Sequence, residues 1–203
     1  MGVVVLSKKV PKLKKPSGLP AGFTLLTYIQ SNGTQHINTE FNPDQNTRVV
    51  FDFEATNAAV AFYFGSRISN ASAQYGFCQT ASTKVRSDYG AKQTPLTVDT
   101  VLRRVTIDKN KENCMYNGTA ITSAASTFAS GYPLYLFAMN NAGTAGNYCS
   151  GKLYACQIYD NGTLVRDFVP CLSDADGIGM YDMVKGAFYG NAGTGVFIGS
   201  EVA

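Results

Sequence analysis

Two acidic residues on one strand-like segment are the first candidates for chemistry. Asp52 and Glu54 alternate with apolar residues in the segment 47–55, so both carboxylates are expected on the polar face of a half-buried strand. Glycosidases use paired carboxylates as acid and nucleophile. A solvated strand face explains the same alternation without any reaction, and we favour it. A hydrolase is therefore only the third choice of function.

The single histidine restricts other kinds of catalysis. Neither a Ser–His–Asp triad nor a histidine-rich metal site can form except around His36, which we expect to be a structural or surface residue. The glycines of residues 190–195 are followed by a strand-like segment and not by a helix, which excludes a phosphate-binding glycine motif. We predict that the chain is not an enzyme and has no catalytic residue.

The cysteine pattern argues against a metal site and against a disulfide framework. The chain has five cysteines, an odd number, without a C-x-x-C pair. We expect small buried side chains in a reducing compartment. The cysteines are Cys78, Cys114, Cys149, Cys156 and Cys171.

Oxygen-rich loops and tyrosines are the remaining ligand candidates. Asn140, Asn141 and the segment 173–177 could supply calcium ligands, but turn chemistry explains both clusters, so we predict no cofactor and keep calcium as the alternative. Exposed tyrosines could form a platform for a glycan, although the absence of Trp weakens this hypothesis. The tyrosines chosen for this role are Tyr63, Tyr75, Tyr89 and Tyr148.

A basic segment opens the chain. Residues 1–20 contain five lysines and no acidic residue, whereas the remaining 12 basic residues stand against 14 acidic ones. Its prolines and like charges predict an extended arm. We favour docking on a partner protein over a solvated tail. The apolar run could add a strand to the edge of a partner's sheet while the lysines contact acidic side chains of the partner. The residues of this docking site are Val3, Val4, Val5, Leu6, Lys8, Lys9, Lys12, Lys14 and Lys15.

Other uses of this arm are disfavoured. Residues 1–20 contain no aromatic side chain for base stacking, which argues against nucleic acid. The apolar run precedes the lysines and is too short for a signal peptide, and no segment reaches the length of a membrane span. We therefore expect synthesis in a cytoplasm and no membrane partner.

We expect these residues to lie on β-strands and in the turns between them. Hydrophobic residues make up 45% of the chain and charged residues 15%, which is enough to build a core, and no segment has a sustained helical period. Alternating or apolar runs separated by turn residues predict an all-β, antiparallel sandwich. The predicted strands are residues 23–30, 35–39, 47–55, 59–67, 75–79, 84–89, 100–108, 111–116, 132–139, 151–160, 163–170, 179–182 and 187–189.

Turn residues predict how some of these strands are connected. Asn161-Gly162 indicates a hairpin, and Asn32-Gly33 indicates a hairpin or a tight corner after the first strand. Residues 100–121 are expected to form a meander at the centre of a sheet. The nearly continuous apolar run 132–139 predicts a strand that is covered on both faces.

Four segments carry a resemblance to a known family. Residues 19–39 resemble the opening of the concanavalin A-like (laminin-G-like) jelly-roll family found in bacteriophage structural and gut-bacterial surface proteins, and residues 158–171, 179–184 and 188–191 are similar to its closing part. The resemblance spans residues 19–199 and departs at His36, where the family often has an aromatic residue. It implies a two-sheet jelly roll of the lectin and glucanase type, without establishing that a sugar is bound.

Arm and sandwich together predict an attachment protein. We expect residues 1–20 to be an anchoring arm and residues 21–203 a jelly-roll domain. The leading function is a phage virion structural protein, which means a capsid decoration, head-fibre or tail-associated subunit made in the host cytoplasm and displayed on the particle surface. Its partners would be other virion proteins and further copies of itself, in a number the sequence does not specify. The alternative is a glycan-binding adhesin or host-recognition module that contacts a cell-surface glycan.

Overall fold

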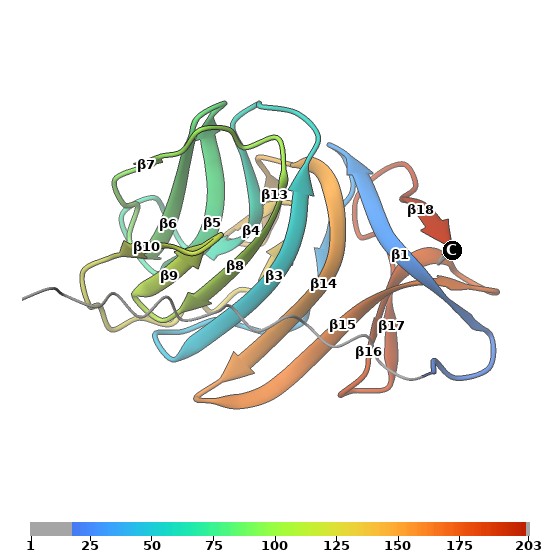
Figure 1. The fold of residues 1–203 in the computed structure, drawn as a ribbon. Coiled ribbons are helices and arrows are strands. Elements are labelled where there is room, and N and C mark those ends of the chain that lie inside the picture. Colours follow the sequence, from blue (N-terminus) through green and yellow to red (C-terminus); the bar gives the residue numbers. More distant parts are fainter. Residues whose placement is uncertain (1–17, 202–203) are drawn as a thin grey trace, which may run out of the picture.

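The computed structural model describes residues 18–201, which form two β-sheets packed face to face (Figure 1). Within this range the chain contains no helix, and so none that is long and apolar enough to cross a bilayer. The predicted all-β sandwich is confirmed for this part of the chain. Of the predicted arm, only Gly18, Leu19 and Pro20 belong to the described residues.

The larger sheet has the strand order β10-β9-β8-β3-β14-β1-β15-β16-β17, and β18 pairs with β1. All of its pairings are antiparallel. The first strand is therefore flanked by strands from the end of the chain. The strands are β1 (Phe23–Asn32), β3 (Thr47–Ala55), β8 (Arg104–Asn110), β9 (Asn113–Tyr116), β10 (Thr119–Thr122), β14 (Ser150–Asp160), β15 (Thr163–Ser173), β16 (Gly177–Asp182), β17 (Ala187–Tyr189) and β18 (Ile198–Glu201).

The smaller sheet has the order β13-β12-β4-β5-β6-β7, with β11 paired to β4 and β2. Its pairings are antiparallel except that β12 runs parallel to β4. The chain crosses repeatedly between the two sheets. The strands are β2 (Ile37–Asn38), β4 (Ala61–Arg67), β5 (Gln74–Ala81), β6 (Lys84–Gly90), β7 (Leu96–Thr97), β11 (Tyr135–Leu136), β12 (Met139–Asn141) and β13 (Thr144–Gly146).

Aromatic side chains fill the space between the sheets. On β3, Phe51 and Phe53 point inward and are fully buried, whereas Asp52 and Glu54 lie on the other face, as the alternation predicts. Phe53 meets Tyr63 from β4 with ring centroids 4.6 Å apart. Interlocking rings of this kind hold the two sheets in a fixed relation.

Two predicted connections are confirmed in outline. Asn161 and Gly162 have φ angles of 47° and 83° and join β14 to β15 as a hairpin, because a type I′ turn needs two left-handed residues. After Asn32 the chain turns a corner, since β1 belongs to the larger sheet and β2 to the smaller one.

Two other expectations are corrected. The meander of residues 100–121 forms β8, β9 and β10 at one edge of the larger sheet and not at its centre, because β8 pairs with β3 and the chain then continues outward through β9 to β10, beyond which no described strand pairs. The apolar run 132–139 is buried as expected, but Phe137 has a φ of 66° and divides it between β11 and β12.

Candidate functional site

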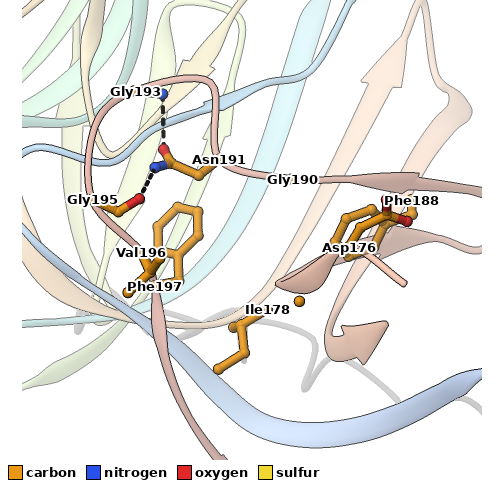
Figure 2. A pocket seen from close by; sticks show the side chains of 10 residues that line it. Asp176, Ile178, Phe188, Gly190, Asn191, Gly193, Gly195, Val196 and Phe197 are labelled. Atoms are coloured by element: carbon orange, nitrogen blue, oxygen red, sulfur yellow. Dashed lines mark hydrogen bonds between the residues drawn. The ribbon is translucent and has the colours of Figure 1, made fainter. Parts of the chain in front are cut away.

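A hollow of about 480 Å³ lies beside the closing strands of the larger sheet (Figure 2). We call it the C-terminal hollow. It is formed by the start of β16, the residues that end β17 and the glycine-rich segment that leads into β18. Its lining residues are Asp176, Gly177, Ile178, Phe188, Gly190, Asn191, Gly193, Gly195, Val196 and Phe197.

Asn191 holds the glycine-rich wall of this hollow in place. Its Oδ1 accepts hydrogen bonds from the backbone N–H groups of His36 (3.1 Å) and Gly193 (2.8 Å), and its Nδ2 donates to the carbonyl of Gly195 (2.9 Å). A Cβ at Gly193 would lie 2.3 Å from the carbonyl oxygen of Thr34. The wall is therefore a fixed loop that needs glycine where it touches the neighbouring strand connection.

The chemistry of the C-terminal hollow is apolar with one carboxylate. Ile178, Phe188 and Val196 contribute aliphatic and aromatic surface, and Val196 is 78% exposed. Asp176 is the only charged residue among those that line it. Such a hollow suits an apolar group that is followed by a cation.

One feature of the sequence points to this hollow. In the run Val196-Phe197-Ile198, a half-buried strand should place polar residues on its outer side. Instead the outer residues are Val196 and Ile198, 78% and 53% exposed, on either side of buried Phe197. Apolar residues on both faces of an edge segment are the pattern that indicates a contact surface.

A second hollow, of about 310 Å³, lies among three turns at one end of the larger sheet, and we call it the turn hollow. The amide side chains of Asn46, Asn110 and Asn161 make no hydrogen bond to any described residue. The guanidinium of Arg48 lies 5.1 Å from the ring centroid of Tyr159. Free amides beside an aromatic ring can bind hydroxyl groups. The hollow is lined by Asn46, Arg48, Asn110, Lys111, Tyr159, Asn161 and Gly162.

The two carboxylates on β3 are engaged in ion pairs and hydrogen bonds. Asp52 accepts two hydrogen bonds from Arg104, at 2.8 and 2.7 Å. Glu54 accepts a 2.6 Å hydrogen bond from the Tyr154 hydroxyl and lies 3.7 Å from the ammonium of Lys152. Burial and then the hydrogen bond to Glu54 raise the pKa of Tyr154. This arrangement provides neither a free acid nor a free nucleophile.

Three of the four tyrosines chosen for glycan binding are in the core. Tyr63 and Tyr75 are fully buried, and Tyr89 is 3% exposed. Their hydroxyls donate to Gln79, to the carbonyl of Lys109 and to that of Gln45, respectively. The expectation of exposed rings is wrong at these positions, because tyrosine on a strand fits a core as soon as its hydroxyl finds an internal acceptor. Tyr148 is half-buried and packs 5.9 Å from the ring of His36.

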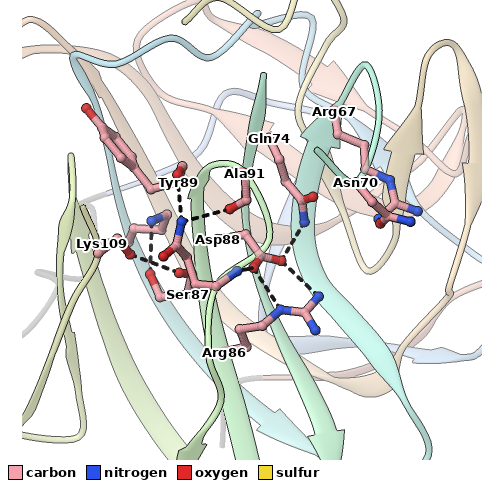
Figure 3. Close-up of polar contacts among 11 residues, drawn as sticks. Arg67, Asn70, Gln74, Arg86, Ser87, Asp88, Tyr89, Ala91 and Lys109 are labelled. Carbon is pink, nitrogen blue, oxygen red and sulfur yellow. Dashed lines mark hydrogen bonds and ion pairs between the residues drawn. The ribbon is translucent and has the colours of Figure 1, made fainter. Parts of the chain in front are cut away.

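The outer face of the smaller sheet carries a buried polar cluster (Figure 3). Arg86 donates to both oxygens of Asp88, at 2.7 and 3.0 Å, and Gln74 points at the same carboxylate. The backbone N–H of Gln93 donates to Asp88 at 2.8 Å. Side-chain exposure is 9% for Arg86 and zero for Asp88. The pair is part of the framework and leaves no free charge for a ligand.

Lys109 is a second buried ion, on the inner face of β8. It is fully buried, its ammonium donates to the Ser87 hydroxyl at 2.9 Å, and it lies 4.6 Å from the ring centroid of Tyr75. No carboxylate among the described residues pairs with it. Burial lowers the pKa of Lys109 to about 8.

The remaining candidates have structural roles in the described part of the chain. His36 is buried against Tyr135, and burial lowers its pKa. Ser173 and Asp176 form a local turn in which the Ser173 hydroxyl accepts from the N–H of Asp176. The Asn140 side chain donates to the carbonyl of Pro133 and accepts from the N–H of Gly143.

Within residues 18–201 no three His, Cys, Asp or Glu side chains lie close enough to hold a metal. All five cysteines are buried and unpaired, as predicted.

No protein-family model matches this chain, and no curated protein matches it either. The arm residues, Val3 to Lys15, lie outside the described residues.

Proposed function

We propose that this chain is a non-enzymatic attachment protein of a phage particle, with a concanavalin A-like jelly roll that is anchored by the N-terminal arm. Asp52 and Glu54 are held by Arg104, Lys152 and Tyr154, which supports binding over hydrolysis. The protein would be a capsid decoration, head-fibre or tail-associated subunit, made in the host cytoplasm and displayed on the particle surface.

One observation carries the proposal. The segments that resemble the opening and closing parts of the jelly-roll family lie side by side in the larger sheet, where Leu25 of β1 is opposite Cys171 of β15 and Phe168 of β15 is opposite Asp182 of β16. Segments far apart in the sequence thus form one continuous region of the sheet. This supports the proposal that the chain shares the fold of the jelly-roll family.

Deletion of residues 1–17 tests the anchoring. We expect the shortened chain to keep the circular dichroism spectrum and melting temperature of the native chain and to be missing from purified particles. Leu19 stays because it packs against the cluster around Val169 and Tyr181. Normal incorporation of the shortened chain into particles would contradict the proposal.

Glycan binding is the second candidate, and the turn hollow favours it. The free amides of Asn46, Asn110 and Asn161 beside Tyr159 suit a neutral sugar. Asn161→Gly combined with Asn110→Ala removes two amides while glycine keeps the left-handed turn. We expect any sugar signal on a glycan array to disappear in this variant and to persist in Asn117→Gly, which changes a similar turn elsewhere (φ 46°). An array without signal for the native chain would remove this candidate.

A further inference from the structure

β18 offers a free strand edge next to the C-terminal hollow. It pairs with β1 from Leu26↔Glu201 to Gln30↔Ile198, and no other strand in residues 18–201 pairs with it. Val196 and Phe197, which line the hollow, lead directly into β18. A free edge presents backbone N–H and C=O groups that can take up one more strand.

The surface along this edge is apolar and bordered by acid. Val196 and Ile198 are 78% and 53% exposed, and Phe188 and Ile178 continue the apolar surface into the hollow. Asp174 and Asp176 are exposed in the turn between β15 and β16, and no described residue forms an ion pair with either. The matching occupant is an extended apolar segment with lysines beside it.

This chain contains such a segment at its beginning. Residues 3–6 are Val-Val-Val-Leu, and Lys8 and Lys9 follow two residues later. β-branched residues favour an extended strand. We propose that residues 3–6 of one copy add a strand to the free edge of β18 in a second copy, with the lysines close to Asp174 and Asp176. This rests on the proposed anchoring function and names a partner of the arm.

The geometry of the connection points to a second copy and not to the same chain. Leu19 and Phe23 belong to the same apolar cluster as Phe188, so the chain enters the domain beside its own hollow. Residues 7–17 contain two prolines and five lysines, which favour an extended connection of roughly 35 Å at about 3.1 Å per residue. A connection of this length is long enough to reach the hollow of a neighbouring copy, in a head-to-tail contact.

Two single variants of the full chain test the contact in solution. Val4→Asp places a charge in the arm segment, and Val196→Asp places one in the hollow, where the exposed position leaves folding intact. By light scattering we expect the native chain to associate and each variant to have the mass of one chain. An equimolar mixture should regain a dimer, because the intact arm of Val196→Asp fills the intact hollow of Val4→Asp. Val60→Asp, at a valine that is 61% exposed elsewhere, should associate like the native chain.

Several results would overturn the inference: a native chain with the mass of one copy at all concentrations, unchanged association of either variant, or a mixture that stays dissociated. No particle is needed here, so the outcome is separate from the anchoring test. If residues 1–17 are required on particles but Val196→Asp associates normally, only the docking is wrong. If both variants behave as expected but particles accept the chain without residues 1–17, only the anchoring is wrong.

Discussion

The ammonium group of Lys109 lies 2.9 Å from the Ser87 hydroxyl in the core, where no described carboxylate pairs with it. Its environment consists mainly of the tyrosine rings from β5 and β6. These rings, the Ser87 hydroxyl and the Lys111 carbonyl, which accepts a long hydrogen bond of 3.4 Å from the ammonium, compensate only part of the lost hydration. The fold thus contains a cation that weakens it near neutral pH.

Replacement of Lys109 should therefore stabilise the protein. The pKa is about 8 in the folded chain against 10.5 for an ordinary lysine. We expect Lys109→Met to raise the free energy of unfolding at pH 7 by up to about 3 kcal/mol, because the full cost of burying the charge applies below the folded pKa. Urea denaturation measures this, and Lys111→Met, at an exposed site, should change stability by less than about 0.5 kcal/mol.

The advantage of Lys109→Met should fade as the pH rises. Between pH 8 and pH 10.5 the unfolded chain holds the lysine proton more tightly than the folded chain, so the native protein gains stability from this group relative to the variant. The difference between the two denaturation midpoints should shrink from pH 7 to pH 10. An unchanged difference would show that Lys109 is not desolvated.

The Arg86–Asp88 pair should be costly to break. Asp88→Asn leaves a buried guanidinium without its partner, which typically costs about 3–5 kcal/mol. The matched control is Asp99→Asn, because Asp99 pairs with Arg103 at 2.9 Å but is 70% exposed, and exposed pairs contribute less than about 1 kcal/mol. Similar losses for the two variants in denaturant titrations would contradict the buried arrangement.

The glycine wall of the C-terminal hollow should tolerate a methyl group at one position and not at another. Gly193→Ala places a Cβ 2.3 Å from the Thr34 carbonyl oxygen, and overpacking of this kind costs about 1–3 kcal/mol. At Gly190 the nearest atom would be 3.3 Å away, on the Phe188 ring, so Gly190→Ala should change stability by less than about 1 kcal/mol. Equal melting temperatures for both variants would mean that the wall is not rigid.

The five buried thiols should react only after unfolding. Burial raises the pKa of Cys78 and Cys149 above the normal thiol range and that of Cys114 to about 11, so thiolate is scarce as well as inaccessible. Mass spectrometry after a short exposure to N-ethylmaleimide at pH 7 should find unmodified native protein and five adducts in guanidinium. A native adduct would identify a cysteine that is reached by local opening.

Local sequence patterns predicted the strands well, but they did not predict which side chains are buried between the two sheets. The segment Thr47–Ala55 was predicted with its observed bounds because its alternation reflects one buried and one wet face. The buried position of Lys109 could have been predicted, since it has the same parity as Val105 and Ile107 on β8. The burial of Tyr63 and Tyr75 could not, because alternation does not tell which face of a largely apolar strand points into the core.

Sheet order and the hollows depend on pairings that no local pattern records. Residues 100–121 meander as predicted, but their place at the edge follows from the pairing of β8 with β3, about fifty residues earlier. The C-terminal hollow joins the start of β16 and the end of β17 with the segment that leads into β18. Turn residues indicated each segment separately, and only the fold brings them together.

The central place of β1 has a consequence for the synthesis of the protein. Its neighbours β14, β15 and β18 all come from residues 150–201 (Figure 1). During synthesis β1 therefore has no strand to pair with until these residues have left the ribosome. Pairing over such sequence separations is slow. The apolar side chains of β1 must therefore be kept from wrong contacts until β14, β15 and β18 have been synthesised.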